Sequence, residues 1–318
     1  SVSGPMDLRN GSADLQVAIK GIEGHVLNFV GRPYGFEFHD TVLSSTNRLV
    51  LGGFGKQIKL RGAINATPVQ MSLDRVSLPS VDVLETQYDF TVDLGGKRAI
   101  FDVLNLKATH KTKQFLAGEI NQTMTIAWGG DVMEAPDSEF ELEVTNTDMA
   151  DWQPWLGRYV KSGAMAANAK IGVRKNGREV RFGSSGSITS LQLPLDGKVI
   201  EIGDFNLTAQ GQVIDFQKLN FTQFVAEAGL PGKNYFKYEG KPIVDITGHS
   251  VSGIGKLEGE LPVFLSWFPQ KEVNCRAGRV EYAGSFSANL RHPQSQSVDG
   301  TLRMKNVQAT IRENSFTN

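Results

Sequence analysis

The chain has 318 residues, of which 40% are hydrophobic and 21% charged, and its formal net charge at pH 7 is −1. This balance excludes the basic stripe of nucleic-acid binders, so we expect no nucleic-acid partner. The single cysteine, Cys275, excludes an internal disulfide and therefore a disulfide-stapled secreted scaffold. No run of 18 apolar residues is present, so the sequence predicts no transmembrane helix.

The first 145 residues alternate apolar and polar side chains with a period of two. Clear examples are LQVAI (15–19), YDFTVDL (88–94) and FELEV (140–144). Because successive side chains of a strand point to opposite faces, this pattern predicts antiparallel strands with one apolar and one solvated face. Glycine pairs at 52–53 and 95–96 are typical of the turns between such strands. We therefore expect an N-terminal β-meander segment over residues 1–145.

The stretch 147–163 interrupts this alternation and predicts a short helix. Thr147 or Asp148 is suited to the N-cap position, and an acidic residue and two tryptophans follow. Gly163 is suited to end the helix. Two later stretches also show helical spacing of apolar residues: LNFTQFVAEAG (219–229) and LPVFLSWFPQ (261–270).

A pattern recurs along the second half of the chain. Trp155 and Trp267 are 112 residues apart, and Gly163 and Gly278 are 115 apart. In both places a helical connector is followed by a glycine and an alternating strand. This spacing predicts a β repeat over residues 146–260 and the start of a further, truncated repeat over 261–318.

The stretch DMADWQPWLGRYVKSGAMAANAKI (148–171) resembles the connector of the AsmA-like proteins, in which an aspartate, a hydrophobic residue and a tryptophan precede a Gly-led amphipathic strand. This superfamily includes the TamB-like bacterial relatives of the bridge-like lipid-transfer proteins. The strand ladder at 177–213 is similar to theirs too. The resemblance covers roughly residues 145–310, extends more loosely to the first 140, and is one of style rather than of an invariant motif.

The resemblance implies a curled antiparallel sheet whose apolar inner face shelters lipid acyl chains on their way between the membranes of a bacterial envelope. It implies phospholipid or another lipid as ligand, and membrane and envelope proteins as partners. The typical N-terminal transmembrane anchor of the family is absent from the sequence. The implied location is the periplasm, with attachment to the inner membrane by a segment that is not in this chain.

We accordingly predict an all-β fold: an extended curled antiparallel sheet with a few short connector helices. Two β-sandwich domains, divided near residue 145, are the alternative, because both architectures require one apolar face per strand. The candidate lining of the lipid groove is the set of apolar positions in the better-matched repeat: Ala167, Ala169, Ile171, Val173, Val180, Phe182, Phe205 and Leu207. Each CH₂ of an acyl chain buried there contributes about 0.8 kcal/mol.

Motifs for catalysis and metal binding are incomplete. GHSVSG (248–253) has Ser252 where a nucleophile elbow requires its second glycine. GIGKLEG (253–259) has Glu258 where a dinucleotide fingerprint requires its third glycine. The five histidines are scattered singly, without a zinc-binding pattern. We therefore expect a protein that is not an enzyme and that has neither a metal site nor a cofactor.

The sequence thus favours a non-enzymatic lipid-handling protein. The alternative is a structural or adhesive β-sandwich protein of the cell surface, in which the same apolar positions are packed against each other. A carbohydrate-active enzyme on a β scaffold is a third hypothesis, which no motif supports.

Overall fold

The computed structural model describes residues 1–73, 76–128, 136–157, 159–175, 179–195, 197–214, 217–230, 233–267, 273–289, 291–311 and 314–317. Strands account for 74% of the chain, and nineteen of them are linked by antiparallel pairings into one hydrogen-bonded sheet. The prediction of an all-β antiparallel fold is confirmed. The topology is the single-sheet arrangement rather than the two-sandwich alternative, because all nineteen strands belong to one antiparallel sheet.

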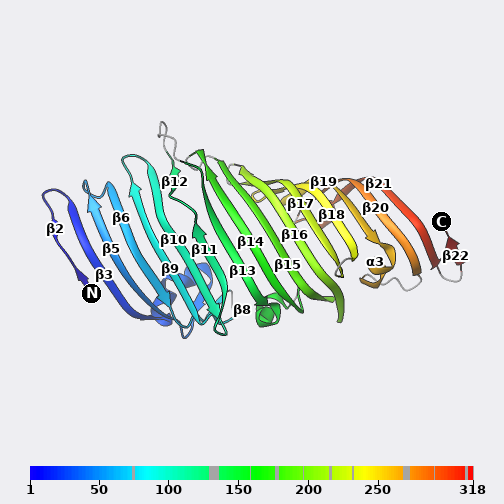
Figure 1. Ribbon diagram of the computed structural model, residues 1–318, viewed down its shortest axis with the longest axis horizontal. Coiled ribbons are helices and arrows are strands. Elements are labelled where there is room, and N and C mark those ends of the chain that lie inside the picture. The colour runs from blue at the N-terminus through cyan, green and yellow to red at the C-terminus, as the bar shows by residue number, and fades with distance from the viewer. Residues whose placement is uncertain are drawn as a thin grey trace. The chain divides into compact units, whose positions relative to one another are not determined.

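The chain forms two compact units. Unit 1 consists of Ser1–Arg158 and Met165–Arg181, and unit 2 consists of Tyr159–Ala164 and Phe182–Asn318. Each unit contains a continuous series of neighbouring strands, which Figure 1 shows in chain order from blue to green and from green to red.

The large-sheet strands of unit 1 are mostly long. They are β1 (Val2–Ser3), β2 (Met6–Asp7), β3 (Ser12–Glu23), β5 (Val42–Gly52), β6 (Gln57–Ala66), β9 (Val83–Asp93), β10 (Arg98–His110), β11 (Lys113–Ile120), β12 (Met124–Ala127), β13 (Ser138–Asp148) and most of β14 (Ser162–Arg174). The short strands β4 (Phe36–Phe38), β7 (Met71–Leu73) and β8 (Val76–Ser77) form a separate small sheet. The helical turns are α1 (Gly24–Gly31), η1 (Arg32–Tyr34), η2 (Met149–Trp152) and α2 (Gln153–Leu156).

The sheet of unit 1 is amphipathic, as its sequence alternation predicts. Directly opposed residues of neighbouring antiparallel strands lie on the same face. One such row runs Leu15, Leu49, Leu60, Phe90, Phe101 across five strands. The opposite face carries ion pairs between neighbouring strands, including one of 2.7 Å between the side chains of Arg48 and Asp14.

Unit 2 continues with strands of up to 17 residues. They are β15 (Glu179–Leu195), β16 (Lys198–Ile214), β17 (Lys218–Leu230), β18 (Lys233–Asp245), β19 (Ser250–Glu260), β20 (Val273–Asn289), β21 (Ser297–Ile311) and β22 (Asn314–Thr317). The helical segments are α3 (Leu261–Trp267) and the turn η4 (Pro293–Ser295). In Figure 1, α3 lies at one end of its neighbouring strands.

The helix predictions were correct in part. Asp148 caps η2, since its side chain accepts a hydrogen bond from the backbone N–H of Ala150, and α3 forms within the predicted 261–270. The helical turns after Asp148 end at Leu156, and Gly163 lies inside β14. The predicted helix 219–229 is wrong, because this stretch is strand β17.

The recurring connector pattern has a counterpart in the backbone. Gly163, near the start of β14, has φ 148°, and Gly278, early in β20, has φ 149°. These values lie in the region that favours glycine. A side chain at Gly278 would contact Val307 and Leu261, and one at Gly163 would contact Ile188 at 2.7 Å. Each glycine therefore allows the strand after a helical connector to approach its neighbours closely.

Candidate functional site

One face of the unit 2 sheet is apolar across six strands. A first row of opposed residues runs Ala226, Tyr238, Leu257, Tyr282, Leu302 from β17 to β21. Two more rows flank it on the same strands: Ala228, Phe236, Gly259, Val280, Met304 and Phe224, Gly240, Gly255, Gly284, Gly300. From β16, Phe205 and Leu207 extend the first two of these rows. We call this surface the unit 2 apolar face.

The other face of the same strands is polar and carries cross-strand ion pairs. Lys237 pairs with Glu227 at 3.2 Å, and Lys305 pairs with Glu281 at 2.8 Å. Arg279 makes a further ion pair with Glu258. Because the charged side chains of these strands occupy one face only, the sheet has one apolar face and one polar face.

An aromatic row crosses the unit 2 apolar face. The rings of Phe182, Phe221, Phe224 and Tyr238 follow one another edge to face, with centroids 5.2, 5.6 and 5.9 Å apart. Phe286 continues the row from Tyr238 at 6.5 Å. Each of these side chains is only partly buried. Such rings offer large, flat apolar surfaces to a ligand that lies across the strands.

The four glycines beside this row leave space for tyrosine rings. A Cβ atom at Gly255 would lie 2.7 Å from Cε2 of Tyr238, and one at Gly300 would lie 2.9 Å from Cε2 of Tyr282. The two tyrosine rings therefore lie over the backbone of these glycines, where a larger residue would leave no space for them. Burial raises the pKa of the Tyr238 phenol, whereas the Tyr282 hydroxyl donates to backbone carbonyl oxygens at 3.0 Å.

Helix α3 covers one end of the unit 2 apolar face. The ring of Phe264 packs on that of Phe236 with centroids 5.8 Å apart, and Val263 packs beside it against the buried cluster of Leu191, Ile202 and Ala228. Gly259 lies beneath Phe264, where any side chain would overlap the ring. This end of the face is a packed core, and the remainder lies beyond the reach of α3.

The predicted lining residues of unit 2 lie on this face. Phe205 packs against the buried cluster beside α3 and therefore contributes to the core. Leu207 is opposed to Ala226, farther from the helix. Phe182 begins the aromatic row. The predicted contact of these three residues with lipid remains a proposal.

The other predicted lining residues belong to unit 1 and share one strand face by alternation. In β14, Lys170 pairs with Glu141 on the polar face at 2.5 Å, so the odd-numbered positions point the other way. These are Ala167, Ala169, Ile171 and Val173. Ile171 is 43% exposed, whereas Val173 is buried. Val180 lies on the face opposite to Arg181, whose ion pair with Glu179 marks the polar side.

Of the aromatic row, the sequence predicted only Phe182 as a lining residue. Phe221 and Phe224 lie in the stretch predicted to be a helix, and Tyr238 and Phe286 lie outside the predicted lining residues, which fall between 167 and 207. The alternation in YFKYEGKPIV (235–244) and VEYAGSFSA (280–288) is the signal that places Tyr238 and Phe286 on an apolar face.

The exposed area of the chain shows how little of its apolar surface is packed away. The accessible surface is 19989 Å², compared with about 13,000 Å² for a compact protein of this mass. Among the described residues only twelve hydrophobic side chains are buried: Ala13, Ala66, Val69, Ala108, Met124, Met149, Val173, Leu191, Ile202, Ala209, Ala226 and Ala228. Only four of the twelve are larger than alanine and valine, so most large apolar side chains remain accessible.

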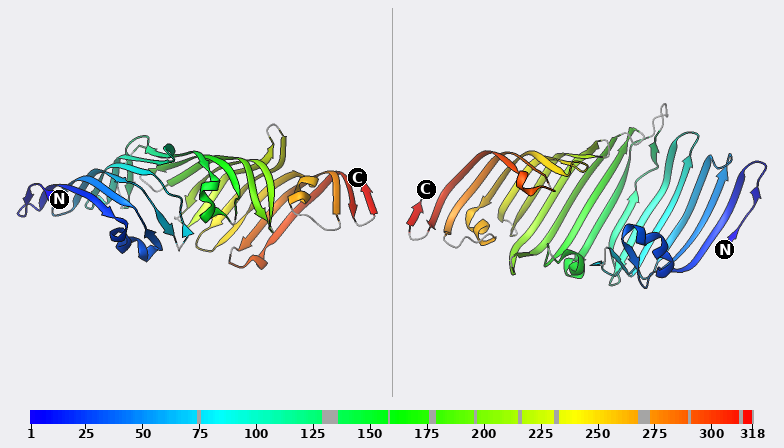
Figure 2. Two further views of the ribbon diagram at one scale, coloured as in Figure 1. Left: turned by 90° about the horizontal axis from the view of Figure 1, so that it is seen from below. Right: turned by 180° about the vertical axis from the view of Figure 1, so that it is seen from behind.

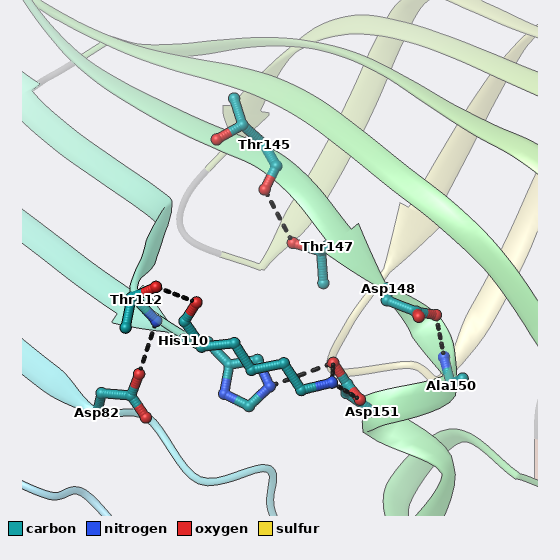
Figure 3. Close-up of polar contacts among 9 residues, drawn as sticks. Asp82, His110, Thr112, Thr145, Thr147, Asp148, Ala150 and Asp151 are labelled. Carbon is teal, nitrogen blue, oxygen red and sulfur yellow. Dashed lines mark hydrogen bonds and ion pairs between the residues drawn. The ribbon is translucent and has the colours of Figure 1, made fainter.

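A polar cluster lies in unit 1 where β10 turns into β11 (Figure 3). Asp151 of η2 accepts hydrogen bonds from Nζ of Lys111 at 2.7 and 2.8 Å, and Nε2 of His110 lies 3.2 Å from its Oδ2. Asp82 accepts a bond from the backbone N–H of Thr112. Lys111 and Thr112 both have positive φ, 50° and 64°. Because two carboxylates from distant segments hold this strained turn, we interpret the cluster as a structural tie.

This tie makes the stability of unit 1 depend on pH. The bond from Lys111, and then that from His110, hold the pKa of Asp151 below its usual range. A lowered folded pKa stabilises the fold above the unfolded pKa near 3.8, and this contribution is lost as the pH falls through the folded value. Asp151→Asn is expected to cost about 1 kcal/mol in the free energy of unfolding at pH 6, a difference that shrinks at pH 3. Urea titrations at both pH values would measure it, and an equal difference at both would contradict the assignment.

No family model matches the chain, and no curated protein or solved structure matches it. Within the described ranges, no helix is long and apolar enough to cross a bilayer. In the same part of the chain, no three His, Cys, Asp or Glu side chains are grouped to hold a metal ion.

Proposed function

We propose that this protein is a non-enzymatic lipid-handling protein that binds acyl chains on the unit 2 apolar face. The observation that carries the proposal is the composition of this face: three neighbouring rows, each five strands wide, contain only apolar residues, tyrosines and glycines. An apolar surface of this extent is unfavourable in water unless a ligand or partner covers it. An acyl chain that lies across the strands would contact the aromatic row and the aliphatic side chains beside it.

The resemblance of 148–171 to the connector of AsmA-like proteins supports a cellular location and a ligand for this function. It favours the periplasm of a bacterial envelope and phospholipid as the ligand. Transport between membranes fits a face that runs continuously from strand to strand, because a chain can move along it without crossing a polar barrier.

A structural or adhesive module is the second candidate, since an uncovered apolar face also suits a protein partner. The two candidates differ in what the purified chain carries. Native mass spectrometry with organic extraction is the direct test: near-stoichiometric lipid that detergent removes is expected for the lipid-handling function. A clean mass without extractable lipid would favour the structural module.

Two exposed residues provide a matched pair of variants. Leu302 lies on the unit 2 apolar face, opposed to Tyr282. Ile254 lies on the polar face of β19, opposed to Lys241, and both side chains are more than half exposed. Leu302→Asp is expected to lower the co-purified lipid several-fold, whereas Ile254→Asp is expected to leave it unchanged. Because neither residue is buried, both variants should remain folded by circular dichroism. Equal lipid content in the two variants would contradict the placement of the ligand.

A further inference from the structure

Helix α1 of unit 1 packs against the protein through its least apolar side. Gly24, Leu27, Asn28 and Gly31 follow the spacing i, i+3, i+4, i+7 and are the buried or half-buried positions of the helix. This spacing defines one face of an α-helix. In most amphipathic helices the large apolar residues occupy the buried face, and here that face contains two glycines and an asparagine.

These small and polar residues fix the helix to β4. The backbone N–H of Phe38 donates to Oδ1 of Asn28 at 2.6 Å, and Nδ2 of Asn28 donates to the carbonyl oxygen of Phe38 at 3.1 Å. A Cβ atom at Gly31 would lie 2.7 Å from the ring of Phe38, and one at Gly24 would overlap the carbonyl oxygen of His39. The orientation of α1 is thus set by close backbone approach and two hydrogen bonds.

The outward side of α1 and η1 is apolar. Its exposed fractions are 43% for Val26, 84% for Phe29, 72% for Val30 and 74% for Tyr34. Val26, Phe29, Val30 and Tyr34 follow helical spacing and form a stripe, which we call the α1 stripe. The views of Figure 2 show α1 standing away from one face of the unit 1 sheet. His25 and Arg32 are exposed beside the stripe.

We propose that the α1 stripe inserts into the interfacial layer of a lipid bilayer and docks unit 1 on a membrane. Burial of these four side chains would cover on the order of 500 Å², which is less than the roughly 800 Å² per partner of a stable protein interface. Insertion into a bilayer has no such minimum area, because the apolar interior accepts each side chain separately. An apolar stripe with tyrosine and arginine at one end is the composition of helices that lie at membrane interfaces.

Vesicle binding tests the proposal in the full chain. Unlabelled protein is sedimented with phosphatidylcholine vesicles, and Phe29→Asp combined with Val30→Asp is compared with wild type. The double variant is expected to bind more than about ten-fold more weakly, because two inserted apolar groups become charged. Leu8→Asp is the matched control: Leu8 is 81% exposed in unit 1 but lies in the turn between β2 and β3, and wild-type binding is expected.

A second variant reports insertion directly. Phe29→Trp should bind as wild type does, and its fluorescence should shift to the blue and be quenched by brominated phosphatidylcholine. Absence of both changes, or equal vesicle binding by wild type and the double variant, would overturn the proposal. So would a change in oligomeric state in the double variant without any loss of vesicle binding, because the stripe would then be a contact between copies.

The inference rests on α1 and not on the lipid bound to unit 2, and one measurement separates the two proposals. The amount of lipid that co-purifies with the double variant should equal that of wild type. If the wild-type protein does not bind vesicles although lipid co-purifies with it, membrane docking is refuted and the lipid-handling function stands.

Discussion

Replacement of Gly284 with alanine is expected to destabilise unit 2 by about 3 kcal/mol, at the upper end of the cost of overpacking. The added Cβ atom would overlap the carbonyl oxygen of Asp299 and the hydroxyl of Tyr282, and would lie 2.6 Å from Cα of Gly300. Backbone atoms of a neighbouring strand cannot yield as a flexible side chain can. Urea unfolding followed by tyrosine circular dichroism would measure the loss.

Gly183→Ala is the matched control for this variant. Gly183 is also a strand glycine of unit 2, but the nearest atom to an added Cβ is Cγ of Gln210 at 4.0 Å. We expect a change within about 0.5 kcal/mol, as for ordinary surface substitutions. A similar loss at both positions would mean that glycine in these strands matters through the unfolded state, not through the space that Tyr282 occupies.

Replacement of Phe264 with alanine is expected to have an effect of similar size, about 3 kcal/mol. Its ring packs on Phe236 above Gly259 and closes the buried cluster around Leu191 and Ala228. Removal of the ring leaves a cavity at the covered end of the unit 2 apolar face. Urea unfolding would measure the change in stability. Binding of an environment-sensitive apolar dye should increase, because more of the face becomes accessible.

Ser266→Ala in the same helix is the control for Phe264→Ala. Ser266 is exposed, and its hydroxyl donates to the carbonyl oxygen of Val263. Its replacement is expected to change stability by less than about 0.5 kcal/mol and to leave dye binding unchanged. If both variants behave alike, α3 does not seal this end of the face.

The faces of the sheet could be predicted from the sequence because period-two alternation reports side-chain direction directly. Phe90 was expected on an apolar face, and it is opposed to Leu60 on the neighbouring strand. Alternation does not reveal which strands pair or how a face is covered. For that reason the sequence placed Phe205 on an apolar face but did not predict that it packs against the buried cluster beside α3.

The failed helix at 219–229 has a specific physical cause. The pairing of β16 with β17 shifts between Gln210 and Gly211, so that Phe221 and Phe224 both point to the apolar face although they are three residues apart. A β-bulge therefore reproduced the i, i+3 spacing of a helix. The strand-forming phenylalanines and Thr222 were the contrary signal.

Helix α1 escaped prediction for the opposite reason. Its sequence, GHVLNFVG, begins and ends with glycine and has no side-chain N-cap, so it lacks the usual signals of a helix. Tertiary contacts supply what local sequence does not, above all the two hydrogen bonds between Asn28 and the Phe38 backbone. Neither the helix nor its exposed stripe could be inferred from composition or periodicity.

The pairing of each strand with its neighbours in chain order has a consequence for how unit 2 comes apart. Few contacts link strands that are distant in the series, so cooperativity runs in one dimension, as in a repeat array. Amide protons of β21, beside the short β22, should exchange faster than those of β17, which is paired along both edges. Such a sheet is expected to open strand by strand, and each strand that detaches removes only its own width from the apolar face that remains.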